Sequence, residues 1–337
     1  MKSQKHPEKF PATENLLGRP IGFGSLYDIH GQQSGLVGEF AGVGLHSGRF
    51  VTMRIHRNQG MSGIWFVRSD LPGRPRALAN ISNVRPTPLS TTVFHGELPL
   101  VSTIEHVMAA LWCAGIDSAV IEVNGPEVPI LDGSAIGFLG VFRAKMNGHP
   151  PGARRFIRVR KTVTVSGANG GSAEIGPHHG FHVTADIDYR NDVIGHMRYS
   201  GEMTPEKFAT DIAPARTFAL ERDIFTLRAR GLALGGSLDN AVVVGDTSVL
   251  NPGGLRFPDE FVRHKVLDAI GDLYLAGMPI LGRYRGHRAG HALHAELLRA
   301  LLSDPTAWDI LKQEDWDPRH HGFHRPVATT GAVATAW

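Results

Sequence analysis

The sequence predicts an α+β fold made of two related halves, and two observations support this fold class. First, two stretches far apart in the chain align without gaps, Leu111–Gly115 (LWCAG) and Leu273–Gly277 (LYLAG). Second, each stretch closes a helical segment with a glycine and leads through a short segment to another helical pattern, over residues 135–146 and 291–302. When the same order of elements occurs twice in one chain, the chain is typically built from a duplicated unit. We therefore expect matched helices from both halves to meet at one site.

The first half is expected to begin near Gly38 and to end near residue 150. Runs rich in β-branched and aromatic residues predict its strands, and a Pro-rich connection separates them from the first helix. The elements expected here are strands at 51–55, 63–67 and 120–123, a helix from Thr103 and a helix over 135–146.

The second half is expected to cover residues 151–311. It follows a Gly- and Pro-rich break at residues 148–152 and opens with a strand at 156–159. Residues 1–37 have weak periodicity and are interpreted as a mobile extension, and residues 312–337 as a flexible tail. Three histidines of the tail (His320, His321 and His324) lie among Gly and Pro, and we assign them no metal role.

The composition excludes several classes of protein. The chain has 337 residues, 42% of them hydrophobic, and no apolar run long enough for an integral membrane segment. Its single cysteine and the absence of a secretory signal favour the cytoplasm. The formal net charge of +3 comes without a basic helix or a recognised nucleic-acid module, so we expect a small anionic substrate and no nucleic acid. A monomer is the default expectation.

A polar stripe on the helical segment around residue 264 is the strongest functional signal. His264 and Asp268 are four residues apart, so they project side by side, separated by roughly 40° around the helix axis. Asp272 continues the stripe one turn further. An apolar stripe on the other side points into a core; it consists of Val262, Val266, Ile270 and Leu273. In the alignment of the two halves, His106 corresponds to Asp268, which favours a shared metal site.

Each of these residues also has an ordinary structural interpretation. His264 and Asp268 can form a surface ion pair, and Glu105 can complete a capping box with Ser102. His106 can be a core histidine among apolar neighbours. A glycine-rich run at Gly42–Gly48 looks like a phosphate loop, but it does not join a strand to a helix, so dinucleotide binding is not favoured.

Seven ordered motifs give the chain a close resemblance to a known family. They are GVGLHSG from Gly42, STIEH from Ser102, PEVPILDGSA from Pro126, ARTF from Ala215, LGGS from Leu234, RHKVLDAIGDL from Arg263 and GHAL from Gly290. Together they resemble the UDP-3-O-acyl-N-acetylglucosamine deacetylases, zinc enzymes of lipid A synthesis, over roughly residues 38 to 310. Two positions depart from the family pattern, because Ala219 stands where glycine is common and His294 where asparagine is common.

The resemblance implies a fold and a catalytic apparatus. The fold is two β-α-α-β layers that form a sandwich with the active site between them. His106, His264 and Asp268 are expected to bind Zn²⁺, with Fe²⁺ as an alternative for such ligands. The expected catalytic residues are Glu105 as general base, Thr217 at the oxyanion, and His291 paired with Asp272 at the leaving group. The competing interpretation of His291 is a polar residue at a helix start.

The resemblance also implies substrate contacts. Lys265 and, with less support, Arg288 are expected to meet the nucleotide phosphates, and Phe218 to lie against the sugar or acyl chain; a solvated lysine and a core phenylalanine are the alternatives. The family carries an insertion that forms an apolar groove, which we place near residues 188–215. Its candidate lining residues are Val193, Ile194, Met197 and Phe208.

The expected function is therefore metal-dependent removal of acetate from a nucleotide-sugar lipid, UDP-3-O-(3-hydroxyacyl)-N-acetylglucosamine. Two alternatives remain at this stage. One is a non-catalytic binding or regulatory homologue, and the other is a zinc hydrolase that acts on another acylated sugar. The sequence does not determine the acyl chain length.

Overall fold

Two large sheets with the same strand order form the framework of the computed structural model, which describes residues 35–57, 62–87, 89–145, 154–167 and 170–315. The first sheet has the order β1-β2-β8-β3-β4, and only the β8–β3 pair is parallel. Its strands are β1 (Leu36–Val43), β2 (Phe50–Arg57), β8 (Ser118–Val123), β3 (Gly63–Arg68) and β4 (Arg76–Leu78).

The second sheet repeats this topology strand for strand. Its order is β10-β11-β16-β12-β13, and within this path only β16–β12 is parallel. Two further strands extend it, because β9 pairs with both β16 and β17. The strands are β9 (Arg155–Val159), β10 (Val163–Ser166), β11 (Ser172–Gly176), β12 (Phe181–Asp188), β13 (His196–Glu202), β16 (Ile280–His287) and β17 (Trp308–Lys312). The predicted α+β fold of two related halves is thus confirmed.

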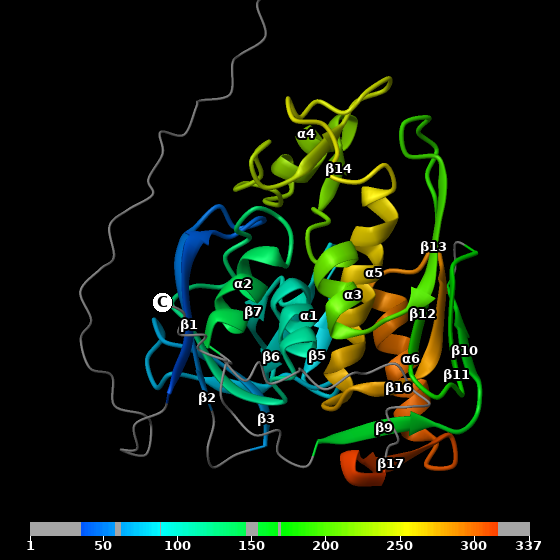
Figure 1. Cartoon of the computed structure of the whole chain (residues 1–337). Helices are drawn as coiled ribbons and strands as arrows, with labels where there is room; N and C mark the ends of the chain where they lie inside the picture. The colour runs from blue at the N-terminus through cyan, green and yellow to red at the C-terminus, as the bar shows by residue number, and fades with distance from the viewer. Residues whose placement is uncertain (1–34, 58–61, 88, 146–153, 168–169, 316–337) are drawn as a thin grey trace, which may run out of the picture. The chain divides into compact units, whose positions relative to one another are not determined.

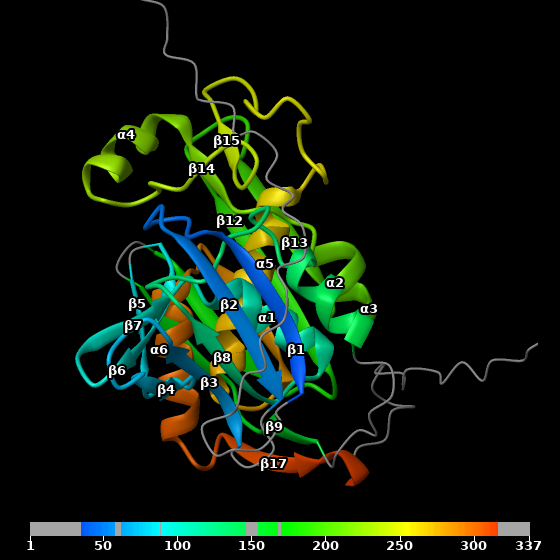
Figure 2. The ribbon, with the colours of Figure 1, turned by 90° about the vertical axis from the view of Figure 1, so that its left-hand side faces the viewer.

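Four helices lie between the two sheets (Figure 1 and Figure 2). They are α1 (Glu105–Ala114), α2 (Ile136–Lys145), α5 (Glu260–Leu273) and α6 (His291–Ser303). The order helix, strand, helix is α1-β8-α2 in the first half and α5-β16-α6 in the second, as the sequence predicted. Both aligned glycines end helical segments in the left-handed conformation: Gly115 follows α1, and Gly277 follows the short 3₁₀ helix η2 (Tyr274–Ala276).

The core joins the halves around α1. Nearly every residue of α1 is buried, as expected for a central helix that is apolar on most sides. Trp112 of α1 packs against Phe181 and Phe208 of the second half, with ring centroids 5.8 and 5.7 Å apart. Each fully buried side chain of this size contributes about 1.5–3 kcal/mol to stability. Such packing holds α1 firmly against the second half.

Helices α1 and α5 cross at very short range through Gly271. A Cβ atom at this position would lie 2.0 Å from the carbonyl oxygen of Glu105, the first residue of α1. Only glycine allows the two backbones to approach this closely. The crossing brings the start of α1 against the polar stripe of α5.

Smaller elements surround this framework. A three-stranded sheet contains β5 (Val84–Pro86), β6 (Thr91–His95) and β7 (Leu98–Ser102). A parallel β-α-β unit, which stands apart from both large sheets, contains β14 (Phe218–Leu220), α4 (Glu221–Ala229) and β15 (Val242–Val244) (Figure 1). After β13, the chain forms α3 (Pro205–Lys207) and the π-helix η1 (Phe208–Ile212).

The expected position of the insertion, residues 188–215, needs correction. Strand β13 within this range pairs with β12 in the large sheet, and Phe208 is fully buried in the core. In the second half, the unit outside the large sheet is instead residues 218–244. Short apolar runs from a core strand and from a surface groove look alike in sequence, which explains the misplacement.

The limits of the fold also differ slightly from the expectation. Strand β1 begins at Leu36, before Gly38, and β17 with the 3₁₀ helix η3 (Gln313–Asp315) extends past residue 311. The boundary expected near residue 150, the extension up to residue 34 and the three tail histidines lie outside the described residues. Among the helices that the structure describes, none has the length and apolar character needed to cross a membrane.

Candidate metal centre and active site

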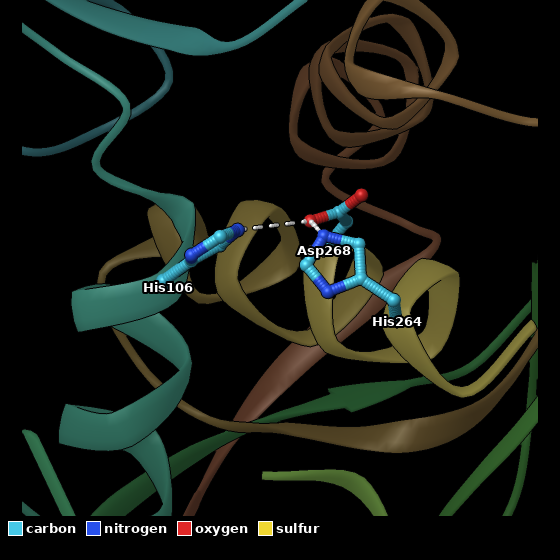
Figure 3. A group of neighbouring side chains, drawn as sticks. All are labelled: His106, His264 and Asp268. Atoms are coloured by element: carbon cyan, nitrogen blue, oxygen red, sulfur yellow. Dashed lines mark ion pairs between the residues drawn. The ribbon is translucent and has the colours of Figure 1, made fainter. Parts of the chain in front are cut away.

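Three side chains converge where α1 crosses α5 (Figure 3). Oδ1 of Asp268 lies 3.7 Å from Nε2 of His106 and 3.4 Å from Nε2 of His264. All three residues are buried. The surface ion pair that the sequence allowed for His264 and Asp268 is therefore excluded, and His106 joins them from the other half as the alignment indicated.

The three donors fit a bound metal ion better than they fit one another. Separations of 3.4 and 3.7 Å are long for hydrogen bonds but close to the edge of a zinc coordination tetrahedron, roughly 3.4 Å. Nδ1 of His264 donates to the carbonyl oxygen of Ala215 at 3.1 Å, which leaves the Nε2 lone pair free. Burial lowers the pKa of His106 to about 3 and also lowers that of His264, so both imidazoles are neutral at pH 7. Neutral imidazole is the ligand form.

The second oxygen of Asp268 is held by Lys265. The ammonium of Lys265 donates to Oδ2 at 2.7 Å and lies 5.9 Å from the ring centroid of Phe218. Burial raises the pKa of the Asp268 carboxyl, but the charge of Lys265 and the neighbouring histidines together outweigh burial and bring the pKa below its usual range. Asp268 is therefore ionised at neutral pH, with Oδ1 directed at the two histidines.

Glu105 lies beside this cluster as the first residue of α1. Its carboxylate is buried, and Oε2 accepts a hydrogen bond from the backbone N–H of Thr91 at 3.0 Å. Burial raises the pKa of Glu105 to about 8, although the positive charge of His291 opposes this. The helix has no side-chain cap, so the capping-box interpretation of Glu105 is wrong. A buried carboxyl with a raised pKa next to three metal-ligand candidates is typical of a general base.

Asp272, one turn beyond Asp268, organises a second polar cluster. Its Oδ1 accepts from the Thr91 hydroxyl at 2.6 Å, and its Oδ2 accepts from Nδ1 of both His291 and His294 at 2.7 Å. His291 is the first residue of α6. Burial lowers its pKa, but the carboxylate of Asp272, with smaller contributions from Glu105 and Asp268, outweighs burial and raises the pKa to about 9. His291 is therefore an imidazolium at pH 7.

Thr217 and Phe218 stand at the start of the β-α-β unit, and the Phe218 ring borders the His264 side chain. The preceding residue, Arg216, is anchored by the fully buried Glu260, whose Oε1 accepts from Nε of Arg216 at 2.8 Å. The backbone N–H of Thr217 donates to the carbonyl oxygen of Gly133 in the first half at 2.8 Å. Phe218 packs edge-on against the His264 ring, with centroids 6.3 Å apart. Residues from both halves thus fix this corner of the site.

Arg288 is placed less favourably than the other predicted residues. It is exposed at the end of β16 and has a left-handed backbone with φ of 46°. Its backbone N–H donates to the carbonyl oxygen of Asp186 in β12. A role in phosphate binding stays a prediction.

The glycine-rich run at Gly42–Gly48 is a hairpin connection between the antiparallel strands β1 and β2. The backbone N–H groups of His46 and Ser47 donate to the buried Glu127 carboxylate at 2.8–3.1 Å. Glu127 also accepts from the hydroxyl of Thr103, two residues before Glu105. The Glu127 carboxylate thus accepts from the backbone N–H groups that a bound phosphate would need. This run is therefore not a dinucleotide-binding loop, as the sequence indicated.

Comparison with known proteins identifies the family of this chain. The family model described as UDP-3-O-acyl N-acetylglycosamine deacetylase matches residues 37–303. The chain belongs to the UDP-3-O-acyl N-acetylglycosamine deacetylase family. Proteins named UDP-3-O-acyl-N-acetylglucosamine deacetylase are 42% identical to it in Neisseria gonorrhoeae (84% of this chain and 93% of the relative), Pasteurella multocida (85% and 94%) and Brucella melitensis biotype 2 (81% and 95%).

Several supporting residues of this deacetylase family member were not found by sequence reasoning. Thr91 falls where the sequence predicts only a Pro-rich connection, yet it begins β6 and holds both Glu105 and Asp272. Glu127 and Glu260 look like ordinary surface acids in the sequence, but both are buried and bind backbone donors. His294 stands out in the sequence only as a departure from the family motif. No local pattern indicates such contacts, because each joins segments distant in the chain.

Proposed function

We propose that this chain hydrolyses the N-acetyl group of UDP-3-O-(3-hydroxyacyl)-N-acetylglucosamine, releasing acetate and the free amine, with Zn²⁺ held by His106, His264 and Asp268. Family membership supports the reaction. The main structural support is that two neutral imidazoles, of His106 and His264, and the ionised carboxylate of Asp268 come together beside the buried Glu105. Two nitrogen donors and one oxygen donor suit zinc, and Fe²⁺ accepts the same set.

The chain's own residues provide the proton transfers. When bound, zinc would polarise the amide carbonyl and lower the pKa of water towards neutrality. Glu105, in its ionised form, accepts a proton from the attacking water as the C–O bond forms. His291, kept protonated by Asp272, donates a proton to the departing nitrogen as the C–N bond breaks. The immediate products are therefore a neutral amine and acetic acid, which releases its proton at neutral pH to give acetate. Return of the proton from Glu105 and reprotonation of His291 restore the enzyme.

Thr217 is proposed as a donor to the oxyanion that forms on the acetamide carbonyl. Its hydroxyl makes no hydrogen bond to any other residue in the part of the chain that is described. Its backbone is fixed by Gly133, where an added Cβ would lie 2.1 Å from the carbonyl oxygen of Asn240. A donor that is fixed in place costs no reorganisation when the negative charge develops.

The substrate is proposed to bind along α5 and the β-α-β unit. Lys265 keeps its ammonium beside the site, where it can meet a phosphate while it remains bonded to Asp268. Arg288 is a second phosphate candidate, and the Phe218 ring is placed for the sugar or the start of the acyl chain. The β-α-β unit offers exposed apolar side chains for the chain itself, Phe225 and Leu234.

We place this reaction in the cytoplasm. The chain has a single cysteine, Cys113, so no intrachain disulfide can form, and its buried thiol donates to the carbonyl oxygen of Pro205 at 3.2 Å, which suits a reducing compartment. A monomer is sufficient in this proposal, because all ten proposed site residues lie within one chain.

The test is acetate release from UDP-3-O-(3-hydroxymyristoyl)-N-acetylglucosamine by the purified full-length chain. We expect turnover to disappear after chelation and to return with zinc, and to a comparable extent with Fe²⁺ under anaerobic conditions. A folded, metal-loaded protein that releases no acetate from this substrate would contradict the proposed reaction. Activity that survives complete metal removal would contradict the cofactor.

The proposed ligands can be tested by metal content alone. His264→Ala removes one of three protein ligands, so we expect zinc affinity to fall at least a hundredfold and the isolated protein to lose most of its metal. His196→Ala is the matched control, because His196 is an exposed histidine on β13. Equal zinc content in both variants, measured by atomic emission, would show that His264 is not a ligand.

A further inference from the structure

The Asp272 carboxylate is shared by two histidines of one helix. His291 and His294 are three residues apart on α6, so their side chains lie on the same face. Both Nδ1 atoms lie 2.7 Å from the same oxygen, Oδ2 of Asp272. His294 is fully buried, with its ring packed 5.7 Å from that of Tyr284 on β16. The proposed mechanism uses His291 and leaves His294 unexplained.

The short distances identify a hydrogen-bonded group. A separation of 2.7 Å is that of a strong N–H···O⁻ bond and is well below the spacing of roughly 3.4 Å between ligands of one zinc ion. A carboxylate oxygen only accepts, so both Nδ1 atoms carry hydrogen. With the Thr91 hydroxyl on Oδ1, Asp272 therefore accepts three hydrogen bonds inside the protein.

We propose that His294 is a positioning residue for His291. Its N–H group donates to the Asp272 carboxylate, which fixes the orientation of that carboxylate and weakens the attraction of Asp272 for the proton of His291. The inference rests on the proposed role of His291 as proton donor. A carboxylate that is stabilised by additional donors is a weaker base. Without His294, the charge of Asp272 acts on His291 alone, the carboxylate can rotate, and the proton is held more tightly.

Other charged groups near His291 also affect how tightly its ring holds the proton. Glu105, Asp268 and Asp272 favour the imidazolium, whereas the neighbouring histidines oppose it when they are charged. The titratable groups that face it are His46 from the β1–β2 connection, Glu105 and His106 from α1, His264, Asp268 and Asp272 from α5, and His294 from α6. Among them, only Asp272 is hydrogen-bonded to the His291 ring in the described residues.

The experiment compares His294→Leu with His294→Asn in the full-length, zinc-loaded enzyme. Asparagine places an N–H donor at the same δ position, whereas leucine fills similar space without a donor. For His294→Leu we expect kcat to fall about tenfold with KM little changed, as for the loss of a hydrogen bond to a charged group. We also expect the basic limb of the pH profile of kcat/KM to move to higher pH. His294→Asn should restore both.

A second variant tests the same inference without a change at His294. Thr91→Val removes the hydroxyl that donates to Oδ1 but keeps the backbone N–H that holds Glu105. We expect it to shift the basic limb in the same direction as His294→Leu, even if the leucine variant folds poorly. An unchanged limb in folded His294→Leu or in Thr91→Val would overturn the inference, as would an asparagine variant that behaves like leucine.

One more variant separates this inference from the proposed function. If His291→Ala keeps full activity, His291 is not the proton donor and the proposed mechanism fails. If His291→Ala is inactive while His294→Leu has the normal kcat and pH profile, the mechanism stands and only the role of His294 is rejected.

Discussion

Gly271→Ala is expected to destabilise the fold by about 3 kcal/mol or more and to abolish metal binding. The added methyl group would lie 2.0 Å from the carbonyl oxygen of Glu105 and 2.8 Å from its carbonyl carbon. Both are backbone atoms, so no side chain can rotate to relieve the contact. The helices must separate, which moves His106 on α1 away from the two α5 residues that face it.

Urea unfolding and zinc content measured on the same preparations check this prediction. Gly140→Ala is the matched control, because Gly140 lies within α2 and an added Cβ would meet no atom within 4 Å. Alanine has the higher helix propensity, so this control should be neutral or more stable by up to about 1 kcal/mol. If Gly271→Ala unfolds at the same urea concentration as the control and keeps its zinc, the tight crossing is not required.

Gly271 also illustrates what the sequence can and cannot predict. The stripe of His264, Asp268 and Asp272 follows from helical periodicity, which is a local property. That His106 faces this stripe follows from the alignment of the two halves. The requirement for glycine between the helices depends on a contact between residues 105 and 271, and nothing near either residue in the sequence indicates it.

The misplaced insertion has a different cause. Val193, Ile194 and Met197 have the apolar character of a groove lining, but Ile194 is buried in the core and Met197 lies in β13 of the large sheet. The β-α-β unit that stands apart begins at Phe218, directly after Thr217, so the sequence motif itself marks its start. Apolar composition does not tell a core strand from a lipid-binding surface, because both bury apolar side chains against apolar partners.

Glu105→Gln is expected to reduce turnover by a hundredfold or more while zinc content stays near normal. Glutamine keeps the shape of the side chain and an oxygen that accepts from the Thr91 N–H, but it cannot take a proton from water. Acetate release and zinc content of the same sample check the prediction. Near-normal turnover would remove Glu105 from the mechanism, and a loss of zinc would show that its charge supports metal binding.

The same variant should change how the stability of the metal-free protein depends on pH. Burial raises the pKa of Glu105 from an ordinary value near 4.5 to about 8, so the folded state holds its proton where the unfolded chain has released it. Between these values the folded state binds more protons, and its stability falls as pH rises, by roughly 1 kcal/mol per pH unit from this group. Glu105→Gln removes that contribution.

Metal-free Glu105→Gln should therefore match the wild type near pH 4.5 and exceed it by a few kcal/mol near pH 8, in urea unfolding measured with a chelator present. The other groups titrate in both proteins, so the difference reports on Glu105 together with its effect on the charge of His291. A constant difference across this range would mean that the buried carboxyl is already ionised. In that case Glu105 would need no help from a bound cation to become a base, and the raised pKa would have no part in its function.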